Sequence, residues 1–153
     1  MYEVALDEAW EIFDAHLDGA RSALVLVLSA RTLAERARHA LNSSAAALGY
    51  GPAACAFATL GTQKRAEGDA PLDDQALFLL TEGLDPVCLV AADSAAARAL
   101  ARAYRCEVPA GAQSRVFGRT CVAFRDFDAM LDDAQDKQAA WALLKKLPRF
   151  GER

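Results

Sequence analysis

The chain contains no long hydrophobic run and few residues of the types that build metal or redox sites. No uncharged apolar stretch approaches the roughly 18–20 residues that a membrane-spanning helix needs, and the acidic, amphipathic segment 1–18 does not resemble a signal peptide. The 4 cysteines have no CxxC pair and no His at metal-ligand spacing. These absences predict a cytoplasmic protein without membrane association, with reduced, buried thiols at Cys55, Cys88, Cys106 and Cys121.

Basic charge is also scarce. The chain has 17 Lys and Arg against 21 Asp and Glu, which gives a net charge of −4. Proteins that bind polyanions usually carry a basic excess or stripe, so a general nucleic-acid surface is not indicated, although a local basic patch stays open. No linker rich in Pro, Gly or Ser divides the chain, and residues 1–153 are therefore predicted to form a single domain.

Apolar periodicity predicts the first half of the fold. The N-terminal segment 1–19 has its large apolar residues at helical spacing, and this predicts a helix that packs on the body and ends at Gly19. Three continuously apolar runs, residues 23–29, 55–60 and 87–93, predict strands buried on both faces. The spacing of Thr32 and Glu35 predicts a capping box for a helix that ends near Leu48. The residues on the N-terminal helical face are Leu6, Trp10, Phe13 and Leu17.

The second half continues the alternation of strands and helices. Asp73 or Asp74 is the predicted cap of a helix that ends at Gly83, and Asp93 or Ser94 caps the Ala-rich helix that ends at Tyr104. Residues 114–124 predict a hairpin or one bulged strand, and a last helix is predicted over residues 127–147. The alternation predicts a three-layer α/β/α sandwich with a mainly parallel four- or five-stranded sheet.

Polar residues follow the predicted strands at the edge where ligands of open parallel sheets usually bind. No Gly-rich phosphate loop follows any of these strands, and Ser29 has no base at a recognisable spacing. Helix capping accounts for Asp93, and His16 and His39 are interpreted as partly exposed structural residues. The candidate binding residues are Ser29, Arg31, Thr59, Asp93, Arg125 and Asp126.

The order of three phrases, "LDPVCLVAADSAAARAL", "FGRTCVAF" and "FDAMLDDAQDKQAAWALLKKL", resembles the second half of the uracil-DNA glycosylase superfamily. Lys137 and Trp141 stand at the Lys-x-x-x-Trp spacing of that family's closing helix. The resemblance covers residues 22–147 and is strongest after Pro71. It implies a glycosylase-like body over residues 22–147, to which the helix of residues 1–19 is added.

The resemblance also implies where the chemistry would be, and there this sequence departs from the family. Cleavage of a glycosidic bond needs a donor near the base and a positioned water or carboxylate near the sugar of a flipped nucleotide. The family's Gly-rich acidic loop is replaced by "LSARTL", and its base-reading Asn by Thr59 or Leu60. Its His-Pro-Ser turn falls on Arg125, Asp126 and Phe127, and its iron–sulfur cysteines have no counterparts, so no cofactor is expected.

Arg125 is the candidate catalytic residue, because a guanidinium can stabilise an anion where the family keeps its His. Arg31 on the facing loop would join it as a phosphate clamp. The favoured interpretation is nevertheless a local ion pair with Asp126 or Asp128 in a solvated turn.

Three functions follow from these patterns. The leading hypothesis is a catalytically silent glycosylase-like domain, not an enzyme, that binds a protein partner or, second to that, nucleic acid. The alternatives are a divergent active glycosylase that uses Arg125, and a small-molecule or nucleotide binder on a Rossmann-like sheet. An exposed apolar patch on the N-terminal helix would favour a protein partner. A contiguous basic edge would favour nucleic acid, and its residues would be Arg31, Lys64, Arg65 and Arg125.

Overall fold

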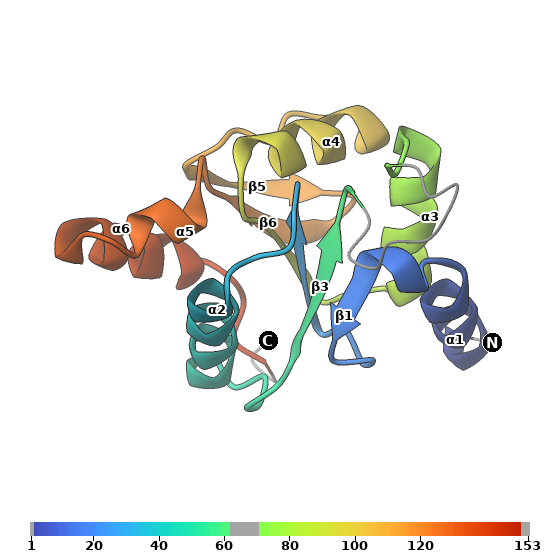
Figure 1. Ribbon diagram of the computed structural model, residues 1–153, viewed down its shortest axis with the longest axis horizontal. Coiled ribbons are helices and arrows are strands. Elements are labelled where there is room, and N and C mark those ends of the chain that lie inside the picture. The colour runs from blue at the N-terminus through green and yellow to red at the C-terminus, as the bar shows by residue number, and fades with distance from the viewer. Residues whose placement is uncertain (1, 62–70, 151–153) are drawn as a thin grey trace.

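The computed structural model describes residues 2–61 and 71–150. One six-stranded sheet forms the centre of the fold, in the order β1-β3-β2-β4-β6-β5 (Figure 1). The strands are β1 (Leu17–Gly19), β2 (Val25–Ser29), β3 (Cys55–Thr59), β4 (Cys88–Ala91), β5 (Ala112–Val116) and β6 (Arg119–Ala123).

Helices cover both faces of this sheet. Helices α1, α3 and α4 lie on one side, and α2, α5 and α6 lie on the other (Figure 1). No helix in the described part of the chain is long and apolar enough to span a bilayer. The helices are α1 (Tyr2–Ile12), the short 3-10 helix η1 (Asp14–His16), α2 (Glu35–Ala47), α3 (Asp74–Leu84), α4 (Ser94–Tyr104), α5 (Phe127–Met130) and α6 (Ala134–Leu144).

The sheet is mixed, so the predicted mainly parallel sheet of four or five strands is wrong. The four inner strands, β3, β2, β4 and β6, are parallel, whereas β1 and β5 pair antiparallel at the two edges. Strand β1 uses Leu17, which helical spacing had assigned to the N-terminal helix. Gly19 ends β1 with a φ of +96°, and an added Cβ there would lie 2.5 Å from the carbonyl oxygen of Cys55. Only glycine accepts that geometry without strain.

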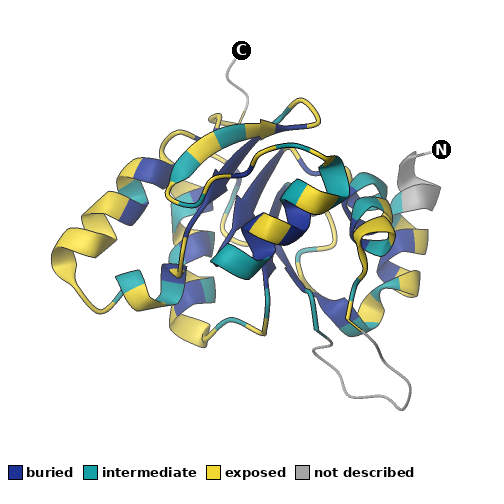
Figure 2. Cartoon of the chain, turned by 90° about the horizontal axis from the view of Figure 1, so that it is seen from above, coloured by how far each residue is buried: buried dark blue, intermediate teal, exposed yellow. Residues whose placement is uncertain are grey.

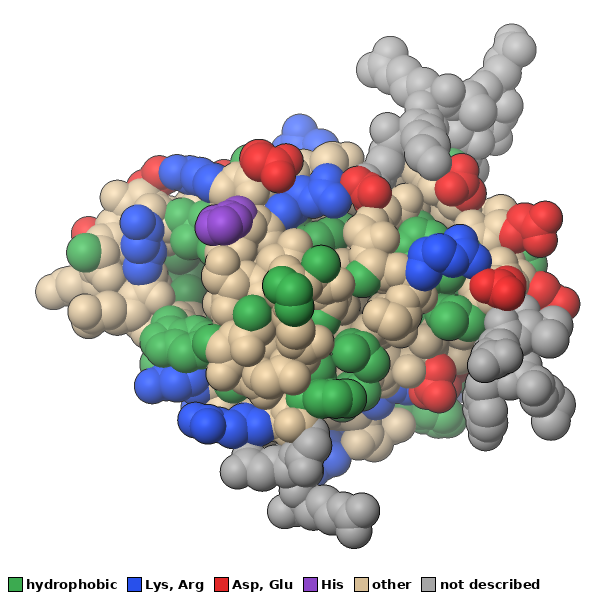
Figure 3. Space-filling view, turned by 90° about the horizontal axis from the view of Figure 1, so that it is seen from below, with side chains coloured by type: hydrophobic (Ala, Val, Ile, Leu, Met, Phe, Trp, Pro, Cys, Tyr) green, Lys and Arg blue, Asp and Glu red, His purple; other side chains and the backbone are tan. Residues whose placement is uncertain are grey.

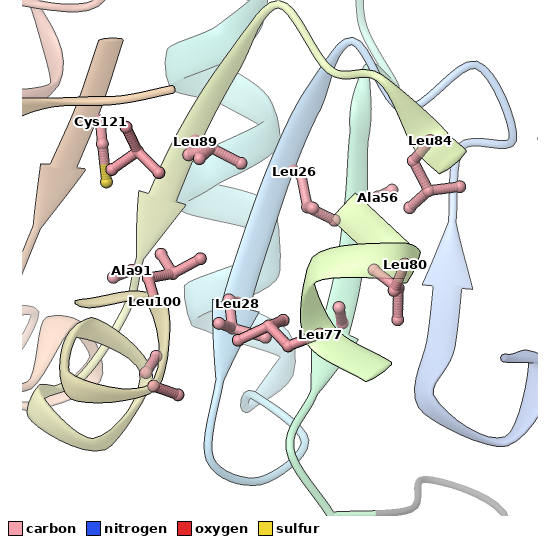
Figure 4. Close-up of a cluster of buried hydrophobic side chains, with 14 of the residues drawn as sticks. Leu26, Leu28, Ala56, Leu77, Leu80, Leu84, Leu89, Ala91, Leu100 and Cys121 are labelled. Carbon is pink, nitrogen blue, oxygen red and sulfur yellow. The ribbon is translucent and has the colours of Figure 1, made fainter. Parts of the chain in front are cut away.

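The inner strands are buried on both faces, as their continuous apolar runs predict (Figure 2). Alternate side chains enter two separate cores, because successive residues of a strand point to opposite faces. Leu26, Leu89 and Leu100 belong to the core under α1, α3 and α4 (Figure 4). Val27 and Val90 belong to the core under α2 and α6.

The cysteine side chains pack in or against these two cores. Cys55, Cys88 and Cys121 are buried free thiols, and Cys106 is half-buried. Burial raises the pKa of Cys88 to about 11 and the pKa values of Cys55 and Cys121 to about 12. These three thiols are therefore protonated packing groups at neutral pH, and the prediction of reduced, buried thiols is confirmed for them.

Several boundary predictions are confirmed and three are wrong. The N-terminal helix ends at Ile12 and not at Gly19. The hairpin of β5 and β6 forms, and Asp73 and Asp93 cap α3 and α4. The predicted capping box is absent, since α2 begins at Glu35 without a side-chain cap. The predicted last helix is two helices, because Asp133 accepts a hydrogen bond from Asp136 N and starts α6 anew. The polar sequence of residues 61–72 predicts a long loop, and most of that segment lies outside the described residues.

Candidate functional site

The loops that follow the four parallel strands meet at one edge of the sheet, and Asp93 joins them. One oxygen of Asp93, Oδ2, accepts a hydrogen bond from Ala30 N at 2.8 Å. The other, Oδ1, accepts one from Ala96 N at 2.8 Å and caps α4. The carboxylate therefore links the loop after β2 to the first turn of α4, and the capping role predicted for it is confirmed.

Backbone contacts join the turn after β6 to Asp93 and Ser94. Asp93 and Asp126 form an antiparallel bridge, and Ser94 N donates to Arg125 O at 3.0 Å. The Asp126 side chain caps α5 by accepting from Ala129 N at 3.2 Å. The backbone around Arg125 is consequently part of the sheet edge, and Asp126 works as a helix cap there.

The hydroxyl groups at this edge also bond to nearby backbone. Ser29 Oγ donates to Arg31 O at 2.7 Å, and Thr59 Oγ1 donates to Gly61 O at 2.5 Å. His16 Nδ1 lies 3.0 Å from Thr59 O and 2.9 Å from Gly61 O. Both neighbours of this nitrogen are acceptors, so Nδ1 carries the proton. His16 is 8% exposed, and its predicted partial exposure is wrong.

Arg125 and Arg31, the two cations predicted at this edge, are both exposed. Arg125 lines a groove of about 500 Å³, and Arg31 is not among the residues that line it. Asp128 is paired with Arg36, and within the described residues Arg125 makes no ion pair with Asp126 or Asp128. The groove is lined by Gly111, Phe124, Arg125, Asp126, Met130, Asp136, Ala139 and Leu143.

A second groove, of about 390 Å³, lies between α2 and the α5–α6 unit. Lys137 and Trp141 stand one helical turn apart on α6 and both face it. Their spacing is visible in the sequence, but the α2 residues that oppose them are not, because α2 lies about 100 residues earlier in the chain. The lining residues are Arg36, Ala40, Ser44, Phe127, Leu131, Lys137, Ala140, Trp141 and Leu144.

Arg36 connects the two walls of this groove. Its Nε lies 3.0 Å from Asp128 Oδ1, its Nη1 lies 2.6 Å from Asp132 Oδ1, and its Nη2 donates to Asp128 O at 3.0 Å. These hydrogen bonds raise the pKa of Arg36 and hold the pKa of Asp132 below its ordinary value. No local pattern in the sequence indicates this contact, because Arg36 and Asp128 are 92 residues apart.

A third groove, of about 390 Å³, is apolar with an acidic rim and lies between α1 and α3. Ile12 is 71% exposed and Leu79 is 53% exposed at its sides, and Ala9 and Phe13 are beneath them. Glu8 and Glu82 line the same groove.

The surface does not present one sign of charge on the face seen in Figure 3. Lys and Arg side chains there are interspersed with Asp, Glu and apolar side chains. Of the four residues in the predicted basic edge, Lys64 and Arg65 lie outside the described residues. Neither a protein-family model nor a curated protein matches this chain.

Proposed function

We propose that the chain is a binding module on a uracil-DNA glycosylase-like scaffold, without catalysis, and that its partner is a protein. The use of the polar side chains at the carboxyl edge carries this proposal. Ser29, Thr59 and Asp93 all bond to the chain's own backbone. A glycosylase must instead present such groups to a flipped base and to a water molecule.

The groove between α1 and α3 supports a protein partner. Large apolar side chains exposed together, as Ile12 and Leu79 are, are typical of protein interaction surfaces. The carboxylate of Glu8 on the same groove opposes the approach of a phosphate backbone, whereas that of Glu82 is paired with Arg119.

A divergent active glycosylase is the second candidate, and one observation favours it. Arg125 lines an open groove at the carboxyl edge of the sheet, where the resemblance would place the base. In that case the guanidinium would stabilise the negative charge of the departing base.

A single-turnover cleavage assay separates the two candidates. Purified protein at stoichiometric concentration is incubated with single- and double-stranded DNA that contains uracil or hypoxanthine. Arg125→Ala is assayed beside Arg115→Ala, a matched change of another exposed arginine, on β5. We expect no cleavage from any of the three proteins. Cleavage that Arg125→Ala alone removes would overturn the proposal and assign Arg125 the catalytic role.

Site-specific crosslinking tests the protein partner. A photoreactive residue at position 79 is expected to capture a protein in cells, whereas the same residue at the exposed position 146 on the far side of the fold captures none. The change Ile12→Asp should abolish the capture from position 79. Equal capture from both positions, or capture that Ile12→Asp leaves intact, would contradict docking at this groove.

A further inference from the structure

The groove between α2 and the α5–α6 unit has the dimensions of a small-molecule site. Its volume of about 390 Å³ lies within the range of roughly 300 to 1,000 Å³ that is typical of ligand pockets. Its base is apolar and is made by Phe127, Leu131, Ala140 and Leu144. Figure 3 shows the recess beside α2, with hydrophobic side chains within it and Lys or Arg side chains next to it.

Trp141 provides a flat wall for this groove. The indole is half-buried, and the ammonium group of Lys145 lies 5.8 Å from the centroid of its ring. An aromatic ring of this kind contributes a large contact area at little cost in conformational entropy. The apolar part of a ligand therefore has both a base and an aromatic wall to contact.

Two cations line the groove, and only one of them is available to a ligand. Arg36 already contacts the carboxylates of Asp128 and Asp132 and a backbone carbonyl. Lys137 is exposed and makes no ion pair within the described part of the chain, and its charge acts at longer range on Asp132, which Arg36 already contacts. A single ammonium beside an apolar base is complementary to one monoanionic group, whereas a phosphate is usually held by several donors.

The Arg36 contacts also fix the two walls of the groove. They connect α2 to α5 through Asp128 and to the turn before α6 through Asp132. A groove whose walls are already held in place needs less ordering when a ligand enters, and this favours affinity.

From this arrangement we infer that the groove binds a small amphipathic carboxylate. The carboxylate contacts Lys137, and the apolar body lies on Phe127, Leu131 and Leu144 against Trp141. This site is separate from the groove between α1 and α3, and the inference stands whether or not a protein docks there.

The test compares two probes of the same shape. Binding of 4-phenylbutyrate and of its neutral amide is followed by NMR through the indole N–H signal of Trp141. The carboxylate should bind about three- to fivefold more tightly than the amide, the ratio expected of one solvent-exposed ion pair. In Lys137→Met the two probes should bind equally, and in the matched control Lys146→Met the preference should be unchanged. In Ala40→Leu, which fills the groove, the shift of the Trp141 signal should disappear for both probes.

Three results would overturn the inference. The first is equal binding of the two probes, or binding of neither, to the unaltered protein. The second is a carboxylate preference that survives in Lys137→Met. The third is a set of NMR shifts that excludes Trp141. Lys137 is an exposed residue of α6, so Lys137→Met is expected to fold, and its amide spectrum verifies this before titration.

Discussion

Two arginines, Arg119 and Arg36, each connect distant parts of this fold, and they do so with nearly the same contacts. Each arginine and its partners form a cluster, the Arg119 corner and the Arg36 corner. Arg119 on β6 contacts Glu82 at 2.7 Å, Asp85 at 2.6 Å and the carbonyl oxygen of Pro86 at 2.8 Å. Arg36 on α2 likewise contacts two carboxylates and one backbone carbonyl oxygen. Their side chains differ in exposure, which is 12% for Arg119 and 48% for Arg36.

The two corners have nearly the same contacts but differ in burial, and burial decides how much each corner contributes to stability. Burial alone would lower the pKa of Arg119, but its hydrogen bonds to Glu82 and Asp85 outweigh that effect and the net shift is upward. Removing one member of a buried cluster leaves the others unpaired at large cost, whereas water replaces the lost partner at an exposed cluster. The Arg119 corner therefore stabilises the fold, whereas the Arg36 corner contributes little stability and mainly shapes a groove.

The largest effect is expected from Arg119→Met. The change leaves Glu82 without its guanidinium partner and should lower the free energy of unfolding by about 2 to 3 kcal/mol. Urea unfolding followed by circular dichroism measures this loss. Arg115→Met, at an exposed arginine on the adjacent strand β5, is the control and should change the free energy by less than about 0.5 kcal/mol. Similar losses in the two variants would break the comparison.

Tyr104→Phe should give the next largest effect. The hydroxyl group of Tyr104 donates to Glu82 Oε2 at 2.5 Å, and burial, followed by this hydrogen bond, raises the pKa of Tyr104. Phenylalanine keeps the ring contacts with Phe78 and Phe117 and removes only the hydroxyl. The expected loss is about 1 to 1.5 kcal/mol in the same urea experiment. A loss as large as that of Arg119→Met would mean that the arginine is not the main partner of Glu82.

The sequence allowed the central strands and several caps to be predicted, because both depend on neighbours in the chain. Continuous apolar runs are sufficient for β2, β3 and β4, whose environment is apolar on both faces. Asp93 precedes its helix directly, so its capping role is a local property. Strand β1 was not predicted because Leu17 fits a helical face, and only pairing with Ala58 makes it a strand.

The two arginine corners could not be predicted for the same reason. Arg36 and Asp128 are 92 residues apart, and Arg119 and Glu82 are 37 apart. Ion pairs between such distant residues leave no periodic signal in the sequence. The meeting of the loops at one edge of the sheet could be predicted, since β2 and β4 run parallel. What those loops do with their side chains depends on hydrogen bonds such as that between Ala30 N and Asp93, which the sequence does not reveal.

Arg36→Met should change stability less than Tyr104→Phe does. The side chains of Arg36 and Asp132 are 48% and 66% exposed, so water and salt already screen their attraction. The difference in urea midpoint between Arg36→Met and the unaltered protein should disappear in about 1 M NaCl, where the screening length is only about 3 Å. The midpoint difference of Arg119→Met should persist in the same salt, because its partners are partly removed from solvent. Persistence of both differences would show that the two corners are energetically alike.

The smallest effect concerns the pH dependence of the Arg36 corner. Hydrogen bonding to Arg36 holds the pKa of Asp132 below its ordinary value of 3.8. The folded pKa is thus lower than the unfolded one, so the pair contributes its stability above about pH 3.8 and loses it as the pH falls through the folded pKa.

NMR titration of the Asp132 carboxyl carbon should give a midpoint below 3.8, and in Arg36→Met the midpoint should return to about that value. The Trp141 indole signal should shift over the same pH range, because protonation of Asp132 releases one wall of the groove that Trp141 lines. A Trp141 signal that stays constant through this titration would show that the groove does not depend on the Arg36 contacts. Apolar packing alone would then hold its walls in place.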